Sequence, residues 1–428
     1  MKTAMHISKS SAGRWLIWSG FAVALVIAPK IFSQGASLSL LSQIGTLMIF
    51  GLSFNMLLGQ GGMLSFGHAV YSGLGAFFAI HAMNLATEGT LPIPVSLIPL
   101  VGGVAGMFFG VLFGYVTTKK SGTTFSMITL GMVELVFASS LMFPKFFGGE
   151  GGISTNRVIG KAVWGITYGP QIEVYYLIAF WLFICTIAMF AFTQTPLGRM
   201  INAVRDNPER AEFIGYNTQW VRYLTLILSA FFAGISGGLS AINFEIVTAE
   251  NVSAIRSGAV LLFSFIGGIG YFFGPMIGAV VGVFLTVMLS DFTKAWQLYL
   301  GVFFILIVMY APGGLAGIWV ANYRMVKFKK WQQLLPSLWK VLLASALIFV
   351  GCVMAIEMLY QRSLALDQGP EVTIFGMTLN VMENSSWLIA GVLVMAGFVL
   401  LSLFKTAFTS AWGTAVSEIE AAILKGAE

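Results

Sequence analysis

Long apolar stretches, separated by short polar or glycine-rich breaks, run through most of the 428 residues. Several of them reach the length of about 20 residues that a helix needs to cross roughly 30 Å of hydrocarbon. Apolar and polar residues do not alternate, as they would in a transmembrane β-barrel. The pattern predicts an all-α, polytopic membrane bundle of about 10–12 spans, some of them broken or re-entrant. The expected helices cover residues 14–32, 38–58, 63–84, 92–118, 123–143, 174–193, 221–243, 258–290, 296–318, 337–359 and 386–404.

The stretch 258–290 does not fit a single span. As one helix it would be roughly 50 Å long, which is too long for one pass and short for two. The glycines and the proline between Gly267 and Pro275 therefore predict a helical hairpin or a broken pair. With that break, most lysines and arginines, including those at 324–330, fall on the cytoplasmic side, as the positive-inside rule expects. Interrupted helices are tolerated where they line a cavity or are buried in protein, so the break also points to a transport path.

The composition supports a membrane protein. The chain is 57% hydrophobic and 9% charged, whereas a soluble domain has about 25% charged residues. The net charge of +6 comes from basic residues at the ends of apolar runs rather than on one polar face, which argues against nucleic-acid binding. Lys2, Lys9 and Arg14 precede an apolar run without a small-residue cleavage site, so we expect an uncleaved first helix and a cytoplasmic N-terminus.

Groups for catalysis or metal binding are sparse. Cys185 and Cys352 both lie in apolar runs, and the three histidines have no metal-ligand spacing. The phosphate-binding pattern G-x-x-x-x-G-K-[ST] is missing from the sequence. We therefore expect no enzyme activity and no metal or cofactor bound by this chain, and we expect the energy for transport to come from another subunit.

Polar residues inside the apolar runs indicate where a pathway would lie. Residues 60–68 place polar groups among glycines, and Glu134 lies mid-span, where a lone carboxylate costs several kcal/mol. Glu134 is either a pathway group or a structural link to a neighbouring helix, with His68 as its partner. Packing roles are the alternative for Asn55 and His68. The predicted pathway residues are Asn55, Gln60, Ser65, His68, Glu134 and Arg256.

The longest charged stretch inside the apolar region is Thr195–Gln219, which faces the cytoplasm in the predicted topology. Pro196 and Gly198 predict an initial turn and Gly215 a helix end. The charged residues between them predict one short amphipathic helix. An ordinary solvated loop is the alternative.

Several ordered blocks resemble the branched-chain amino acid permeases of bacterial ABC importers, in particular the M-type subunit. G-R-M-I-N-A-V-R-D-N-P-E-R-A-E-F-I-G (198–215) is similar to the family's cytosolic coupling segment, and G-L-S-F-N-M-L-L-G-Q-G-G-M-L-S-F-G-H-A (51–69) resembles its signature. T-L-G-M-V-E (129–134), F-I-G-G-I-G (265–270) and Y-A-P-G-G-L-A-G (310–317) agree in order and spacing. The resemblance covers roughly residues 35–320 of the sequence.

The resemblance implies that segment 197–215 docks on a cytosolic ATPase subunit, where ATP and magnesium would be used. It also implies a homologous second permease subunit, two ATPase subunits, an extracytoplasmic solute-binding protein and a small-molecule solute. The location would be the bacterial inner membrane, with both termini cytoplasmic. The implied coupling residues are Gly198, Arg199, Arg205, Asp206, Asn207, Pro208, Arg210 and Gly215.

Two departures from the family pattern matter. Arg256 stands where the family commonly has an acidic residue, which favours a carboxylate-bearing solute unless Arg256 merely pairs with Glu245 or Glu250. Family members also usually end soon after the 310–317 block. Here we expect a permease core at 1–320, an extra transmembrane hairpin at 321–404 and a cytosolic amphipathic tail at 405–428, without an assigned role.

The resemblance favours a permease subunit of an ATP-driven importer for amino acids or related small carboxylates. An ion-coupled secondary transporter or channel that acts without an ATPase is the alternative, because a broken helix and an intramembrane Glu134 fit it as well. A membrane enzyme would require a catalytic constellation, and the sequence offers none.

Overall fold

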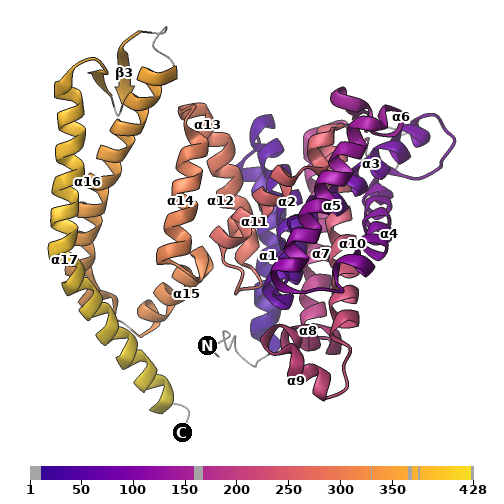
Figure 1. Ribbon diagram of the computed structural model, residues 1–428, viewed down its shortest axis with the longest axis horizontal. Coiled ribbons are helices and arrows are strands. Elements are labelled where there is room, and N and C mark those ends of the chain that lie inside the picture. The colour runs from indigo at the N-terminus through magenta and orange to yellow at the C-terminus, as the bar shows by residue number, and fades with distance from the viewer. Residues whose placement is uncertain (1–10, 159–166, 329, 365–368, 375, 426–428) are drawn as a thin grey trace. The chain divides into compact units, whose positions relative to one another are not determined.

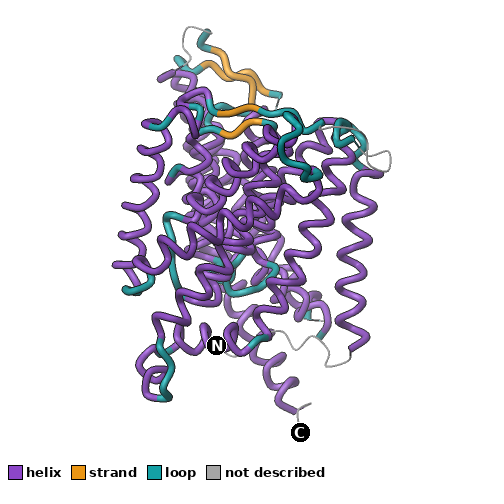
Figure 2. Tube along the Cα trace, turned by 90° about the vertical axis from the view of Figure 1, so that its right-hand side faces the viewer, coloured by secondary structure: helices purple, strands orange, loops and turns teal. Residues whose placement is uncertain are grey.

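The structure is a computed structural model that describes all residues except 1–10, 159–166, 329, 365–368, 375 and 426–428. Lys2, Lys9, Lys329 and the last three residues of the predicted tail lie outside the described residues. Within the described part, nine helices are long and apolar enough to cross a membrane, or ten if a bent pair is counted. The predicted all-α, polytopic fold is confirmed. In Figure 2 the described strands are confined to two short ribbons.

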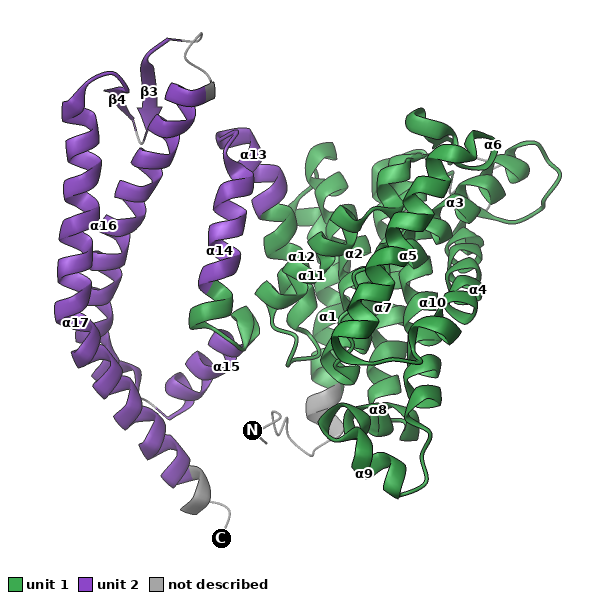
Figure 3. Ribbon diagram, in the orientation of Figure 1, with its two compact units in different colours: residues 1–284, 307–316 green, residues 285–306, 317–428 purple. Residues whose placement is uncertain are grey.

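The chain divides into two compact units, which are described separately (Figure 3). Unit 1 comprises residues 1–284 and 307–316, and unit 2 comprises residues 285–306 and 317–428. The helices of unit 1 are α1 (Ser11–Ile31), α2 (Gly35–Asn55), α3 (His68–Thr87), α4 (Ile98–Thr117), α5 (Gly122–Met142), α6 (Pro144–Phe147), α7 (Gln171–Gln194), α8 (Pro196–Asp206), α9 (Pro208–Phe213), α10 (Thr218–Phe244), α11 (Ala254–Gly267) and α12 (Gly274–Val283).

Short irregular elements complete unit 1. A π-helical turn, Met56–Gln60, continues α2, and 3₁₀ turns lie at Val95–Leu97, Gly149–Gly151 and Ala249–Val252. Strands β1 (Ile153–Ser154) and β2 (Ile246–Val247) pair antiparallel. Within this unit, α8 and α9 lie at one end and α6 lies at the opposite end (Figure 1).

Helix α10 is the central helix of unit 1, because 83% of its most apolar window is buried. Glycines allow its backbone to touch that of α3 and α4. A Cβ added to Gly234 would lie 2.2 Å from the carbonyl oxygen of Gly102, and one added to Gly237 would lie 1.8 Å from that of Ser72. Small residues at such crossings let membrane helices pack closely, so these glycines fix the core of the unit.

The predicted break in 258–290 is confirmed. Helix α11 ends at Gly267 and α12 begins at Gly274, and Gly268 between them has φ 109°, a conformation that favours glycine. The two short helices pack against each other, because a Cβ on Gly278 would lie 1.9 Å from the carbonyl oxygen of Phe263. The segment is therefore a helical hairpin inside the bundle.

The expected span 296–318 is not one continuous helix but a bent pair. Helices α14 (Trp296–Tyr310) and α15 (Gly314–Lys327) meet at an angle of 51°. Pro312 lies in the break and lacks a backbone N–H, so it cannot continue the helical hydrogen-bond ladder. Gly314 follows with φ 64°. The apolar run is continuous in sequence, and for that reason it resembles one span.

Unit 2 is built around two long antiparallel helices. It contains the parts of α14 and α15 outside residues 307–316. Its other elements are α13 (Leu289–Phe292), preceded by a π-helical turn at Phe284–Met288, α16 (Trp331–Leu364), α17 (Asn384–Lys425), β3 (Glu371–Ile374) and β4 (Met377–Asn380). Gly351 and Gly397 bring the two long helices together: a Cβ on each would lie 2.9 Å from the carbonyl oxygen of Ala390 and Ala344, respectively. Strands β3 and β4 form an antiparallel hairpin between the helices.

Two further contacts hold unit 2 together. Glu357 on α16 accepts hydrogen bonds from the Thr293 hydroxyl at 2.7 Å and the Tyr299 hydroxyl at 2.8 Å. Near its C-terminal end, α17 forms an ion pair between Glu418 and Lys330, beside a small apolar cluster. The predicted division at 320 and 404 stays a prediction, although α17 runs through residue 404 without interruption.

Candidate coupling and transport sites

The charged segment 195–217 folds as two short helices joined at a corner. The Thr195 hydroxyl accepts a hydrogen bond from the backbone N–H of Gly198 at 3.2 Å and begins α8. The Asn207 side chain accepts one from the N–H of Arg210 at 2.9 Å and begins α9, with Pro208 in the first turn. Side-chain acceptors at this position satisfy helix N-terminal N–H groups. The segment is therefore two helices and not the single helix that we expected.

The two glycines of this segment have different roles. Gly198 was expected in an initial turn but lies inside the first helical turn of α8, where a Cβ would be 2.1 Å from the carbonyl oxygen of Phe192. It permits the chain to fold back tightly against the end of α7. Gly215 has φ 93° and follows the end of α9, so the predicted helix stop is confirmed.

The outer side of α8 and α9 is polar, with an apolar tip. Among the predicted coupling residues, the exposed ones are Arg199, Arg205, Asp206, Asn207, Pro208, Arg210 and Gly215. Phe213 and Ile214, which were not among the predicted coupling residues, are 90% and 70% exposed at the end of α9. Two neighbouring large apolar side chains in a charged helical stretch are the signal that could have identified them.

The inner side of α8 is bound to the end of α2. Asn202 donates a hydrogen bond to the Gln60 side-chain oxygen at 2.8 Å, and Arg205 donates one to the carbonyl oxygen of Gly59. The stem of Arg205 also covers Gly62, where a Cβ would lie 2.7 Å from Cγ. Gln60, predicted as a pathway residue, thus contacts the predicted coupling segment. This pairing could not be predicted from the sequence, because the partners are far apart in the chain.

The same end of α2 touches the hairpin turn between α11 and α12. A Cβ on Gly59 would lie 2.6 Å from the carbonyl oxygen of Ile269, and Asn55 donates a long hydrogen bond of 3.4 Å to that of Tyr271. The side-chain oxygen of Asn55 is buried and has no hydrogen-bond partner among the residues that the structure describes. A continuous series of contacts therefore links α8, the π-helical turn and the hairpin turn.

Ser65 and His68 lie in the interior of unit 1. Both are 0% exposed. His68 Nε2 lies 2.9 Å from the Ser53 hydroxyl, and its ring stacks on that of Phe50 at 5.3 Å between centroids. In the described part of the chain, His68 Nδ1 and the Ser65 hydroxyl have no hydrogen-bond partner. Helix α3 begins at His68 rather than near residue 63, so the predicted break at 60–68 is a non-helical segment against the core.

Glu134 and Arg256 are not paired as the alternatives required. Glu134 is exposed on α5, whereas His68 is buried and contacts Ser53. Glu245 accepts a hydrogen bond from the backbone N–H of Arg157 at 2.8 Å. Arg256 forms no ion pair within the described residues, and its Nε is buried without a hydrogen-bond partner. Among the described residues of unit 1, neither Glu134 nor Arg256 therefore forms an ion pair.

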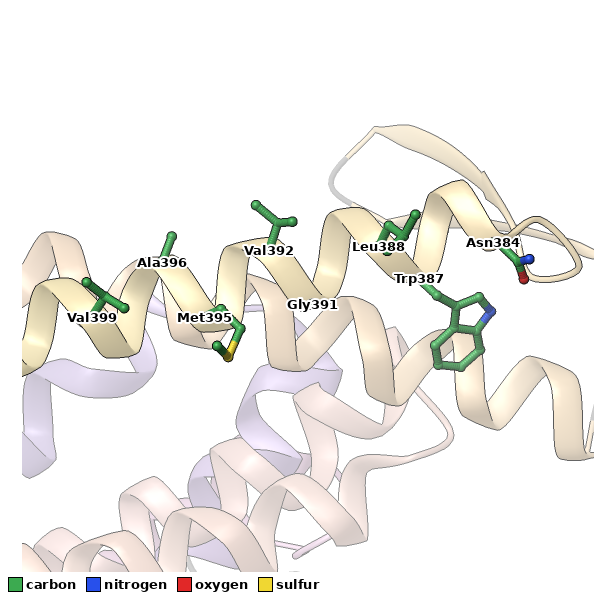
Figure 4. A pocket seen from close by; sticks show the side chains of 8 residues that line it. All are labelled: Asn384, Trp387, Leu388, Gly391, Val392, Met395, Ala396 and Val399. Atoms are coloured by element: carbon green, nitrogen blue, oxygen red, sulfur yellow. The ribbon is translucent and has the colours of Figure 1, made fainter.

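A shallow groove runs along α17 (Figure 4). All eight lining residues, from Asn384 to Val399, come from that one helix, and most are apolar. Figure 4 shows Trp387 and Val392 directed to different sides of the helix. Solute sites have convergent polar groups from several elements, so this groove lacks the features of such a site. Among the described residues, no cluster of three or more His, Cys, Asp or Glu side chains could hold a metal ion.

The fold and these contacts define a multi-pass helical membrane protein whose exposed helical corner is bound to its interior helices. The family model described as branched-chain amino acid transport system / permease component matches residues 37–312. The chain belongs to this family of ABC-transporter permeases.

Relatives of this chain carry different solutes. It is 26% identical to the high-affinity branched-chain amino acid transport system permease protein LivM of Salmonella typhimurium, over 72% of this chain and 76% of the relative. It is 25% identical to the fructose import permease protein FrcC of Rhizobium meliloti (63% and 75% covered). The ribose import permease protein RbsC of Haemophilus influenzae is 22% identical (71% and 95% covered). No solved structure matches the chain significantly.

Proposed function

We propose that this chain is a permease subunit of an ATP-driven importer for amino acids or related small carboxylates in the bacterial inner membrane. Its partners would be a homologous permease subunit, two cytosolic ATPase subunits and an extracytoplasmic solute-binding protein. ATP hydrolysis would take place in the ATPase subunits, and this chain would be non-catalytic. Family membership supports the transporter class, and the similarity to LivM supports the solute class.

The observation that carries the proposal is the α8–α9 corner. Its outer side presents exposed charged residues and the apolar tip of Phe213 and Ile214, which suits a protein groove. Its inner side is hydrogen-bonded to Gly59 and Gln60 at the end of α2. A partner that moves this corner would therefore move the end of α2. This is the arrangement that an externally driven permease needs.

The experiment compares the chain with and without its partners. Reconstitution in proteoliposomes with the co-purified ATPase subunits and binding protein should give uptake that requires ATP. The same permease subunits without the ATPases should give none, also under a sodium or proton gradient. Gradient-driven uptake by this chain alone would replace the proposal with an ion-coupled secondary transporter.

A further inference from the structure

Arg256 lies deep in the membrane. Helix α3 gives the depth scale: Asn84 near its C-terminal end donates to the carbonyl oxygen of Ser154 in the β1–β2 ribbon. Near its N-terminal end, the N–H of Ala69 donates to the Ser257 hydroxyl at 2.9 Å. At about 1.5 Å per residue these points are roughly 22 Å apart. Arg256 precedes Ser257, so it lies inside a hydrocarbon layer of roughly 30 Å.

The chain reaches this depth because the segment before α11 descends along α3. A Cβ on Gly73 would lie 2.5 Å from the carbonyl oxygen of Asn251, so the 3₁₀ turn at 249–252 packs directly on the α3 backbone. Ser253 then accepts a hydrogen bond from the N–H of Arg256 at 3.3 Å and begins α11. Helix α11 is therefore a half-helix that starts within the membrane.

Among the described residues, the guanidinium of Arg256 has no counter-charge at this depth. A guanidinium stays protonated in proteins, and a charge inside the bilayer is costly unless it finds a partner or water. Its Nε is buried without a hydrogen-bond partner, and no described carboxylate lies within ion-pair distance. One side of the first turns is open: Ile255 is 85% exposed, and no atom lies within 4 Å of a Cβ placed on Gly258.

Glu134 lies at about the same depth. On α5, the Thr129 hydroxyl accepts a hydrogen bond from the N–H of Phe66, and Met132 lies beside the Tyr71 hydroxyl on α3. Glu134 lies two residues after Met132 on α5, which places it near the level of Tyr71 on α3. Arg256 lies near the same level, because its neighbour Ser257 bonds Ala69 on α3. Glu134 is exposed and has no ion pair in the described structure.

We propose that Arg256 binds the carboxylate of the transported solute within the membrane, with Glu134 available to the amino group of a zwitterion. The solute carboxylate would pair with the guanidinium through two parallel hydrogen bonds. It would thereby serve as the counter-ion that the described residues do not provide. This inference rests on the proposed function. It also distinguishes this chain from permeases of uncharged sugars, because an uncharged sugar has no anionic group that could pair with an intramembrane arginine.

The test measures ATP-dependent uptake by the whole complex in proteoliposomes with four probes: leucine, isocaproate, isopentylamine and ribose. The first three share one carbon skeleton and differ only in the carboxylate and the amine. For leucine and isocaproate, Arg256→Gln should reduce uptake roughly 10- to 100-fold, as expected for loss of a charge-assisted pair. Arg256→Lys, which keeps the charge but not the fork geometry, should lose less.

Arg222→Gln is the matched control, because Arg222 also has a buried Nε without a partner but lies in the first turns of α10, beside Thr218. It should leave the ratio of carboxylate to amine uptake unchanged. Glu134→Gln distinguishes a zwitterionic solute from a simple carboxylic acid. Reduced uptake of leucine alone indicates a zwitterion, and an equal reduction for isocaproate indicates a simple acid.

Some outcomes would overturn the inference. Equal loss of all four probes in Arg256→Gln, or unchanged leucine and isocaproate uptake in an assembled complex, would mean that Arg256 is structural. ATP-dependent uptake of ribose but not of the carboxylates by the wild type would also reject it. Failure of the wild type to need ATP would instead reject the proposed function, so the two failures are distinguishable.

Discussion

The contacts between α8 and the end of α2 predict a graded loss of coupling. The Arg205 guanidinium bonds the Gly59 carbonyl, and a hydrogen bond to a charged donor is worth about 1.5–3 kcal/mol. Asn202 and Gln60 form a neutral bond of about 0.5–1.5 kcal/mol. The Arg205–Asp206 ion pair, with side chains 38% and 70% exposed, adds about 0–1 kcal/mol after solvent screening.

These magnitudes set an order. If α8 and α2 move together, Arg205→Gln should lower solute transported per ATP roughly 10- to 100-fold, because each 1.4 kcal/mol corresponds to about tenfold. Asn202→Ala should lower it by roughly 2- to 10-fold. Asp206→Asn should have the smallest effect. Gln194→Ala removes an exposed amide that bonds only its neighbour Thr193 and serves as the control.

The assay is simultaneous measurement of ATP hydrolysis and uptake in proteoliposomes that contain the complete transporter. ATPase subunits should co-purify in normal amount with Arg205→Gln and Asn202→Ala, since the altered contacts of these two residues lie on the inner side of α8. Two results would refute the reasoning: an Asp206→Asn defect as large as that of Arg205→Gln, or loss of the ATPases from the Arg205 variant. Either would place the role of Arg205 on the outer side of the corner.

Three further predictions follow from other parts of the chain. Replacing Phe213 and Ile214, which are 90% and 70% exposed, by serine should reduce co-purification of the ATPase subunits while the permease still folds, as a pull-down would show. Gly237→Ala should destabilise unit 1 by about 1–3 kcal/mol, because its Cβ would lie 1.8 Å from the Ser72 carbonyl oxygen; thermal unfolding in detergent measures this, and Gly258→Ala, in open space, is the control. Glu357→Leu should loosen unit 2 by leaving the hydroxyls of Thr293 and Tyr299 without their acceptor, which limited proteolysis should detect between α14 and α16; normal protease resistance would contradict it.

The fold could be predicted largely because span length and glycine placement are local properties of the sequence. The hairpin break at Gly267–Gly274 follows from length alone, because residues 258–290 are too many for one pass through a bilayer and too few for two. The bend between α14 and α15 was missed because the apolar run through Pro312 has the length of one span. The corner at Asn207 was missed because Asn-Pro can lie in a loop or, as here, begin a new helix.

The site could be predicted only residue by residue. Gln60 was predicted as a pathway residue and Arg205 as a coupling residue. That both lie at the same contact between α8 and the end of α2 could not be predicted from the sequence. Their contact depends on the fold of α7 and α8, which returns the chain to the end of α2. Likewise, the lack of a partner for Arg256 follows from the depth of α11, and sequence alone left pairing with Glu245 or Glu250 open.

The uneven packing of unit 1 indicates which part would move when α8 is displaced. Helix α10 is held to α3 by direct backbone contact at Gly237, and overlap of this kind resists sliding. The hairpin turn meets the end of α2 where Gly59 approaches the carbonyl oxygen of Ile269, so a displacement of Gly59 reaches the turn directly. Around this contact the polar groups are poorly satisfied within the described residues: Asn55 donates a 3.4 Å hydrogen bond while its side-chain oxygen is unpaired, as is the Ser264 hydroxyl on α11. Weakly satisfied polar groups cost little to rearrange, and π-helical turns such as 56–60 are frequent at functional sites. A force on Gly59 is therefore expected to shift the hairpin turn, and with it the half-helix that carries Arg256, before it disturbs the α10 core.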